Sequence, residues 1–457
     1  MVFSSMTFLV LFLPIFMAVY FAVPAKYLNV RNFVLLISSL IFYAAGEPVW
    51  VVLIIFSSAV DCLLGILIEK HRGKRIATVM LVISLCASLG LLVLFKYSEF
   101  LLGIIGINIT FAPALPIGIS FYTFQTMSYI IDVYRGRVAA QKSPLKFLTY
   151  VSMFPQLVAG PIIAYIDVQH MLSKRESTLA GVSQGVTRFV MGLGKKVIFA
   201  NHAGAIATQL LDTSAATSST VGVWLGITMF FFQIYFDFSG YSDMAIGLGK
   251  IVGFDFKENF HYPYESKSIT DFWRRWHISL GMFFRNYVYI PLGGNRKRQL
   301  LNIMIIWALT GLWHGASFNF ILWGLYFGVI LVIEKYYLKG ILTRIHAAFA
   351  HVYVLFVVMF GWLIFYFTDL GQFLAMTGHF FGLGGQITDH LAIELFLANL
   401  WVLPIFAIFS TQIPIKVFNY LKGEMPVSEP VLNFTILAFS FMLLIGQSFT
   451  TFIYFRF

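Results

Sequence analysis

The chain has 457 residues, of which 59% are hydrophobic and 11% are Asp, Glu, Lys or Arg, and its mean hydropathy is +0.83. Soluble domains carry about 25% charged residues, so this composition excludes a protein whose surface faces water. The formal net charge of +11 requires no nucleic acid, because basic loops facing anionic lipid account for it. We therefore expect an integral membrane protein that crosses the bilayer many times.

Apolar segments long enough to span a bilayer recur along the whole chain. A spanning helix needs about 20 mainly apolar residues, and by that criterion we expect about eleven transmembrane helices in an all-α polytopic membrane domain covering residues 1–457. The segments 32–46 and 300–313 are too short to span comfortably, so bent or re-entrant helices are expected among them. The clearest candidates are residues 6–24, 32–46, 49–68, 76–95, 115–133, 181–211, 221–250, 300–313, 317–338, 347–368, 391–420 and 431–453.

Basic residues in the first loops predict the orientation. Lys26 and Arg31 follow the first span, the link after the second span has no basic residue, and four Lys or Arg residues lie in 70–75 after the third. Cytoplasmic loops carry the excess of Lys and Arg, so the N-terminus is expected outside and the basic loops in the cytoplasm of a bacterial cell. The first apolar segment lacks the basic start of a signal peptide and is interpreted as a retained span.

The longest polar interruption covers residues 255–298 and holds a high share of the charge. Ser268 to Asp271 resembles a helix start with a capping acid. The spacing that follows predicts one amphipathic helix at an interface, with Arg274 and Arg285 on a face toward lipid head groups or an anionic ligand. Its other face is predicted to carry Trp273, His277, Leu280 and Phe284.

Two histidines are candidates for chemistry. A lone histidine on an apolar face, such as His277, is more often a packing residue than a catalyst. His314 follows 37 residues later in Thr310–Ala316, which is expected to be a break between two apolar segments. Ionisable groups at membrane depth are costly and mark substrate or proton paths, and imidazole suits general-base work near neutral pH.

Five ordered motifs resemble those of the membrane-bound O-acyltransferase (MBOAT) family, and are most similar to its bacterial alginate O-acetyltransferase (AlgI-like) branch. The similarity runs from Met1 to about residue 335. The motifs are residues 116–122 (PIGISFY), 154–161 (FPQLVAGP), 233–243 (QIYFDFSGYSD), 272–277 (FWRRWH) and 312–315 (LWHG).

The resemblance implies an enzyme that moves an acyl group, most simply acetyl, from a cytoplasmic thioester donor across the membrane to a hydroxyl of an exported polysaccharide. It implies that His314 is the catalytic residue and that His277 lies on the donor side of the same tunnel. The donor is expected to be acetyl-CoA or an acylated carrier protein with a phosphopantetheine thioester, and an extracytoplasmic SGNH-type protein is expected to finish the transfer. Candidate substrate contacts within the motifs are Trp273, Arg274, Arg275, Trp276, Trp313, Asp237, Tyr241 and Asp243.

Three other interpretations stay open. D-alanyl transfer to a teichoic-acid-like polymer would use the same chemistry, and a non-catalytic scaffold would keep the fold and lose the chemistry. A proton-coupled transporter is the rival from another class, because Asp132, Asp237 and Asp243 lie in or beside apolar segments.

Cysteine and glycine patterns add no chemistry. Cys62 and Cys86 lie within predicted spans without metal spacing, and no metal site is expected. The segments 192–196 and 247–253 resemble nucleotide loops only superficially, so close helix packing is the favoured explanation of their glycines.

The polar runs also predict the architecture. We expect an MBOAT-type ring of helices around a central funnel or tunnel, with short or tilted helices at about 145–163 and 270–290 forming a thin floor.

Overall fold

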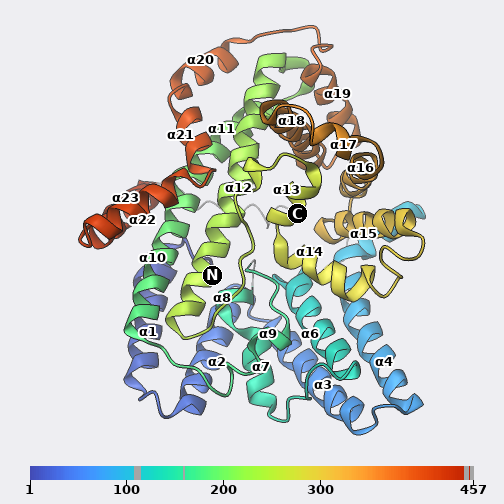
Figure 1. Cartoon of the computed structure of the whole chain (residues 1–457), viewed down its shortest axis with the longest axis vertical. Helices are drawn as coiled ribbons and strands as arrows, with labels where there is room; N and C mark the ends of the chain where they lie inside the picture. The colour runs from blue at the N-terminus through green and yellow to red at the C-terminus, as the bar shows by residue number, and fades with distance from the viewer. Residues whose placement is uncertain (108–114, 158–159, 447–451, 453–457) are drawn as a thin grey trace. The chain divides into compact units, whose positions relative to one another are not determined.

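A computed structural model describes residues 1–107, 115–157, 160–446 and 452 (Figure 1). Within these residues the regular structure is entirely helical, which confirms the all-α prediction. Residues 158 and 159 of the second motif and the end of the predicted span 431–453 lie outside the described residues.

The chain forms two compact units. Unit one comprises Met1–Phe189 and Tyr241–Glu258, and unit two comprises Val190–Gly240 and Asn259–Phe457. Helices α10 (Leu179–Gly194) and α12 (Thr220–Ile251) run from one unit into the other. The assignment of residues 1–457 to a single membrane domain, and the ring around a funnel, remain predictions.

Unit one contains two helical stretches long enough to span a membrane, Val51–Lys70 and Arg75–Ile104, together with shorter helices. In chain order they are η1 (Thr7–Phe12), α1 (Leu13–Ala22), α2 (Leu28–Ala44), α3 (Val51–Lys70), α4 (Arg75–Leu92), η2 (Val93–Tyr97), α5 (Ser98–Ile104), α6 (Ile119–Tyr134), α7 (Pro144–Ser152), α8 (Phe154–Leu157) and α9 (Tyr165–Val168).

Unit two carries the polar interruption and the two candidate histidines. Its helices besides the shared α10 and α12 are η3 (Lys195–Ala200), α11 (Asn201–Leu211), η4 (Ala215–Thr217), η5 (Pro263–Glu265), α13 (Ile269–Arg275), α14 (Ile278–Phe284), η6 (Arg285–Tyr289), α15 (Gln299–His314), α16 (Phe318–Ile333), η7 (Glu334–Leu338), α17 (Lys339–Leu342), α18 (Ala347–Tyr366), α19 (Leu370–Phe380), α20 (His390–Asn399), α21 (Val402–Phe409), α22 (Ile413–Glu424) and α23 (Ser428–Gly446).

The number of spans differs from the expectation. Six helices in the described residues are long and apolar enough to cross a membrane, or seven if α20 and α21, bent by 61°, form one span. The predicted count of about eleven is therefore not confirmed. Several expected spans are shorter apolar helices, among them Leu28–Ala44 and Gln299–His314, as the lengths of 32–46 and 300–313 indicated.

Helix α12 packs closely against α10 through glycines. In unit one, a Cβ atom added at Gly247 would lie 2.6 Å from the carbonyl oxygen of Gly185, and the reverse substitution meets the same obstacle. In unit two, a Cβ at Gly240 would lie 2.8 Å from the carbonyl oxygen of Gly192. These contacts confirm close helix packing, rather than nucleotide binding, as the explanation of the glycines at 192 and 247.

Candidate active site

His277 lies at a break between two short helices. Ser268 caps α13 by accepting a hydrogen bond from the Asp271 amide, as predicted. The predicted continuous amphipathic helix is wrong, however, because Trp276 is extended and His277 is left-handed, with φ 45° and ψ 52°. The carbonyl of Arg275 accepts from the His261 amide and the Ile278 amide donates to the carbonyl of Asn259, so residues 259–261 take over the backbone bonds that would have continued the helix.

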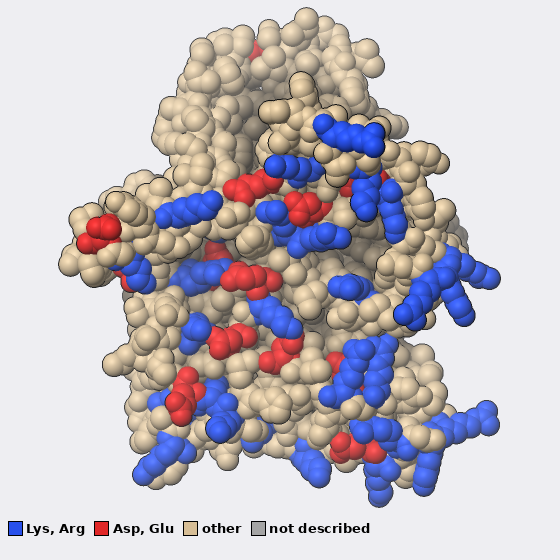
Figure 2. All heavy atoms as spheres, in the orientation of Figure 1, with Lys and Arg blue, Asp and Glu red and all other residues tan. Residues whose placement is uncertain are grey.

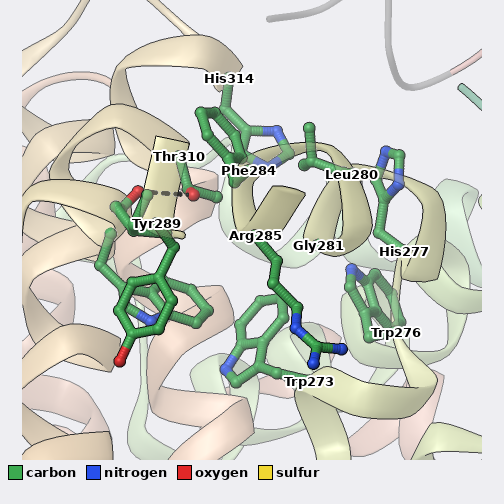
Figure 3. A pocket seen from close by; sticks show the side chains of 12 residues that line it. Trp273, Trp276, His277, Leu280, Gly281, Phe284, Arg285, Tyr289, Thr310 and His314 are labelled. Atoms are coloured by element: carbon green, nitrogen blue, oxygen red, sulfur yellow. Dashed lines mark hydrogen bonds between the residues drawn. The ribbon is translucent and has the colours of Figure 1, made fainter. Parts of the chain in front are cut away.

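The face predicted from the helical spacing nevertheless converges on one cavity, together with His314 (Figure 3). The cavity has a volume of about 190 Å³. Arg285 lines the cavity and is exposed, and its predicted orientation toward head groups or an anionic ligand remains a prediction. The cavity is lined by Trp273, Trp276, His277, Leu280, Gly281, Phe284, Arg285, Tyr289, Ile306, Trp307, Thr310 and His314.

His314 is the last residue of α15, so the expected break begins only at Gly315. Close packing of α15 on α16 sets its position. A Cβ atom at Gly311 would lie 2.1 Å from the carbonyl oxygen of Phe320, and a Cβ at Gly324 would lie 2.1 Å from that of Trp307. Only glycine permits this approach, and it presents the imidazole of His314 to the cavity.

Aromatic edges surround both imidazoles. The ring of His314 meets those of Trp323 and Phe365 at centroid distances of 5.0 and 5.2 Å, both edge-on. Trp313 lies next to both histidines, with its ring 4.9 Å from that of His314 and 5.7 Å from that of His277. Such walls exclude water, which strengthens polar interactions within the site.

His277 is buried with only 5% of its surface exposed. Burial lowers the pKa of His277 to about 3, against a smaller opposing effect of the residue's own backbone. Its Nδ1 atom, like Nε1 of Trp273, has no partner from another residue in the part of the chain that the structure describes. His277 is therefore a neutral imidazole that lines the cavity with unused hydrogen-bonding capacity.

Glu334 fastens the start of α13. Its carboxylate accepts hydrogen bonds from the amides of Ile269 and Thr270 at 2.6 and 2.7 Å, and from the Thr270 hydroxyl at 2.5 Å. A carboxylate at a helix N-terminus satisfies amides that have no partner within the helix. Since Glu334 follows α16 and α16 packs on α15, the start of α13 is linked through Glu334 to the helix pair that carries His314.

The remaining predicted contacts divide into two groups. In the first, from the two tryptophan motifs, Trp273 and Trp276 line the cavity and the ring of Trp313 packs against both histidines. Two arginines of the same motifs do not line the cavity. Arg274 is exposed, and Arg275 forms an ion pair with Asp271 at 3.1 Å.

The second group lies on α12 and outside the cavity lining. Asp237 forms a buried ion pair with Lys196 at 2.6 Å in unit two. In unit one, Asp243 pairs with Arg188 at 2.6 Å and Tyr241 stacks on Phe3. The third acid that suggested a proton path, Asp132, forms an ion pair with Arg137 at 3.5 Å. All three acids are thus engaged in ion pairs.

Sequence reasoning missed several supports of the site. Trp323 packs on the ring of His314 and Trp307 lines the cavity, and Gly324 with Gly328 forms a GxxxG pattern that indicates close helix packing. Asn259 and Glu334 carry no local signal, because their roles depend on residues distant in the sequence.

Comparison with known proteins agrees with the motifs. The family model described as MBOAT, membrane-bound O-acyltransferase family, matches residues 139–377, a range that contains the whole cavity. The chain is 40% identical over 403 residues to the "Probable alginate O-acetylase AlgI" of Azotobacter vinelandii, covering 84% of this chain and 79% of that protein.

More distant relatives modify other polymers. The "Peptidoglycan O-acetyltransferase" of Helicobacter pylori is 30% identical over 438 residues, covering 86% of this chain and 82% of that protein. The "Teichoic acid D-alanyltransferase" of Bacillus subtilis is 30% identical over 239 residues, covering 49% of this chain and 60% of that protein. The motifs, the apolar helices and these matches agree that the chain is a multi-pass membrane O-acyltransferase belonging to the membrane-bound O-acyltransferase family.

Proposed function

We propose that this protein transfers an acetyl group from a cytoplasmic thioester donor to a hydroxyl of an exported cell-surface polysaccharide, with His314 as general base. The observation that carries the proposal is that His277 and His314 line the same cavity, with the rings of Trp313, Trp323 and Phe365 packed against their imidazoles. The similarity to alginate and peptidoglycan O-acetylating proteins supports the acceptor class.

The reaction balances with the groups present. His314 takes the proton of the attacking hydroxyl, whose oxygen forms a bond to the thioester carbonyl carbon. The carbon–sulfur bond then breaks, and the leaving thiolate recovers the proton from the His314 imidazolium. A hydroxyl with a pKa far above 7 needs such a base, which contributes about 10²–10⁴-fold to the rate.

His277 has a different role in this proposal. Its buried neutral imidazole keeps the same charge across the physiological pH range, so it positions the thioester by hydrogen bonding rather than by taking a proton. The donor is acetyl-CoA or an acylated carrier protein, both of which present a phosphopantetheine thioester. The narrow apolar cavity suits the thioester end of that arm and shields it from water.

The acceptor is reached through a partner. A bulky polymer outside the cell cannot enter a cavity of about 190 Å³, so the attacking hydroxyl must lie on a group small enough to reach the cavity, and an extracytoplasmic SGNH-type protein would complete the transfer to the polymer. Full activity of the purified chain alone on mature polymer would refute this part. D-alanyl transfer to a teichoic-acid-like polymer is the second candidate, supported by the relative that matches 49% of the chain.

In this proposal the protein lies in the cytoplasmic membrane of a bacterial cell, with its N-terminus outside the cytoplasm. Basic residues after the first and third spans support this orientation. Within unit two, the end around α19 and α20 carries few charged side chains in the view of Figure 2, whereas residues 255–298 contain eight Lys and Arg residues in the sequence. This asymmetry agrees with a cytoplasmic location of the polar interruption.

Replacement of His314 by alanine tests the base. We expect His314→Ala to lower the rate of thiol release about 10²–10⁴-fold per folded molecule, with acetyl-CoA and an acetylated carrier protein offered in parallel and acceptor present. The matched control is His379→Ala, since His379 is also buried in unit two, binds the carbonyl of Ala215 and does not line the cavity. Normal activity in folded His314→Ala would end the catalytic assignment.

A further inference from the structure

The backbone of His277 is held in a conformation that it would not adopt without support. A left-handed residue other than glycine costs roughly 1–2 kcal/mol, and such residues persist only where the surroundings stabilise them. In the described residues only Tyr262 and Arg298 share this feature with His277 among non-glycine residues, and neither lines the cavity. The strain at His277 therefore coincides with the site, and its support must come from residues that bind the adjoining backbone.

Asn259 provides that support. Its carbonyl oxygen accepts a hydrogen bond from the Ile278 amide at 2.9 Å. Its side-chain Oδ1 accepts two more, from the Ser279 amide at 3.1 Å and from the Ser279 hydroxyl at 2.8 Å. Asn259 is 2% exposed, so water cannot replace these bonds.

The neighbour of Asn259 reinforces the contact. Phe260 packs edge-on against the ring of Trp276 at 5.1 Å and lies 6.1 Å from the ring of His277. One short segment thus holds both the backbone after His277 and the rings beside it. A shift of this segment would move the imidazole relative to His314, although Asn259 itself does not line the cavity.

We propose that Asn259 is a positioning residue for the transfer reaction, which holds His277 in its left-handed conformation and so aims the imidazole into the cavity. The inference rests on the proposed role of His277 toward the thioester. Asn259 touches no reacting atom and acts only through His277. Loss of Oδ1 would remove an acceptor of both the amide and the hydroxyl of Ser279 and so loosen the first turn of α14, where amides have no acceptor within the helix.

A double-mutant cycle tests this coupling in the full-length protein in lipid nanodiscs. The variants are Asn259→Ala, His277→Ala and their combination, and the readout is the initial rate of thiol release from acetyl-CoA and from an acetylated carrier protein, per folded molecule. We expect Asn259→Ala to lower kcat about 10- to 100-fold with the donor KM changed less than about threefold, because misplacement by about 1 Å costs on this order. The double variant should be no slower than His277→Ala alone.

Two further variants grade the effect. Asn259→Asp retains an oxygen acceptor for Ser279 and should recover most of the lost kcat. Ser279→Ala removes the hydroxyl bond and leaves the amide bond, so it should lose less than Asn259→Ala and again add nothing to His277→Ala. This variant carries the test if Asn259→Ala fails to fold.

The control for general destabilisation is Asn32→Ala. Like Asn259, Asn32 has a buried side-chain amide that forms hydrogen bonds to residues distant in the sequence. It donates to the carbonyl of Leu172 and accepts from the guanidinium of Arg175, and none of these residues lines the cavity. It should lower the unfolding temperature and leave kcat unchanged.

The outcomes separate this inference from the proposed function. Normal kcat in folded Asn259→Ala beside a slow His277→Ala overturns the positioning role alone, as do losses that multiply in the double variant. Normal kcat in His277→Ala overturns both the role of His277 and the inference, while His314→Ala still decides the base independently.

Discussion

Gly324 offers a test of whether the packing of α15 on α16 positions His314, the proposed base. Gly324 lies ten residues after His314 in the sequence and does not line the cavity. A Cβ atom there would meet the carbonyl oxygen of Trp307 at 2.1 Å and the Gly311 amide nitrogen at 3.1 Å. Gly324→Ala therefore perturbs the helix that ends in His314 without touching the chemistry.

The size of the effect follows from that overlap. Real Cβ contacts are essentially never below 3.0 Å, so the Cβ of alanine is about 0.9 Å too close, and the obstacle is backbone rather than a flexible side chain. The helices must separate or tilt by a displacement on that order. Overpacking costs about 1–3 kcal/mol, and misplacement of a catalytic group by about 1 Å costs about 10²-fold in rate.

The assay is thiol release per folded molecule, with the unfolding temperature in detergent measured on the same samples. The matched control is Gly378→Ala in α19, where an added Cβ meets no atom within 4 Å. That substitution should leave kcat unchanged and stabilise the helix by up to about 1 kcal/mol. Equal kcat in Gly324→Ala and the native chain would refute the view that close helix packing positions His314.

Three further predictions concern the short-helix region. His277→Gly should unfold at a higher temperature than His277→Ala, because glycine alone adopts a left-handed backbone without cost, and the reverse order would contradict the strain. Burial lowers the pKa of His277 from 6.5 to about 3, so between these pH values the imidazole is protonated in the unfolded chain and neutral in the folded one. Stability contributed by the neutral imidazole is therefore lost as the pH falls below 6.5. As the pH is lowered from 7 to 5, the free energy of unfolding of the native protein should therefore fall by about 1 kcal/mol per pH unit more than that of His277→Gln. Equal slopes of the two proteins over this range would refute the burial effect. Glu334→Ala should destabilise the protein by about 2 kcal/mol or more and Glu334→Gln by less, because only the glutamine retains an acceptor for the amides of α13, and equal melting temperatures would contradict the cap.

The helical spacing of the polar interruption correctly grouped four residues that line one cavity, although the continuous helix on which that grouping was based is wrong. Trp273, His277, Leu280 and Phe284 do line one cavity, yet the helix breaks at His277. Helical spacing indicates which side chains face the same environment, and this grouping can hold even where two short helices replace one continuous helix. The break itself depends on hydrogen bonds from residues 259–261, which no local pattern encodes.

The count of spans shows the opposite limit. Composition excluded a water-facing protein, but the described residues contain six or seven helices long and apolar enough to cross a membrane, so the expected count of about eleven is not confirmed. Helix α15 is shorter than a usual span and packs closely on α16, and neighbouring protein can cover the backbone of such a helix.

The sequence by itself determined the medium, the helical class, the family resemblance and the two histidines, because each of these depends on composition or on residues close together in the chain. Only the tertiary structure decided that His277 and His314 line the same cavity and that Asp237 pairs with Lys196. It also identified Asn259 and Glu334 as supports of the two short helices. The physical reason is that a buried polar group is stabilised by whichever partner the fold brings within hydrogen-bond distance, and sequence separation carries no information about that partner.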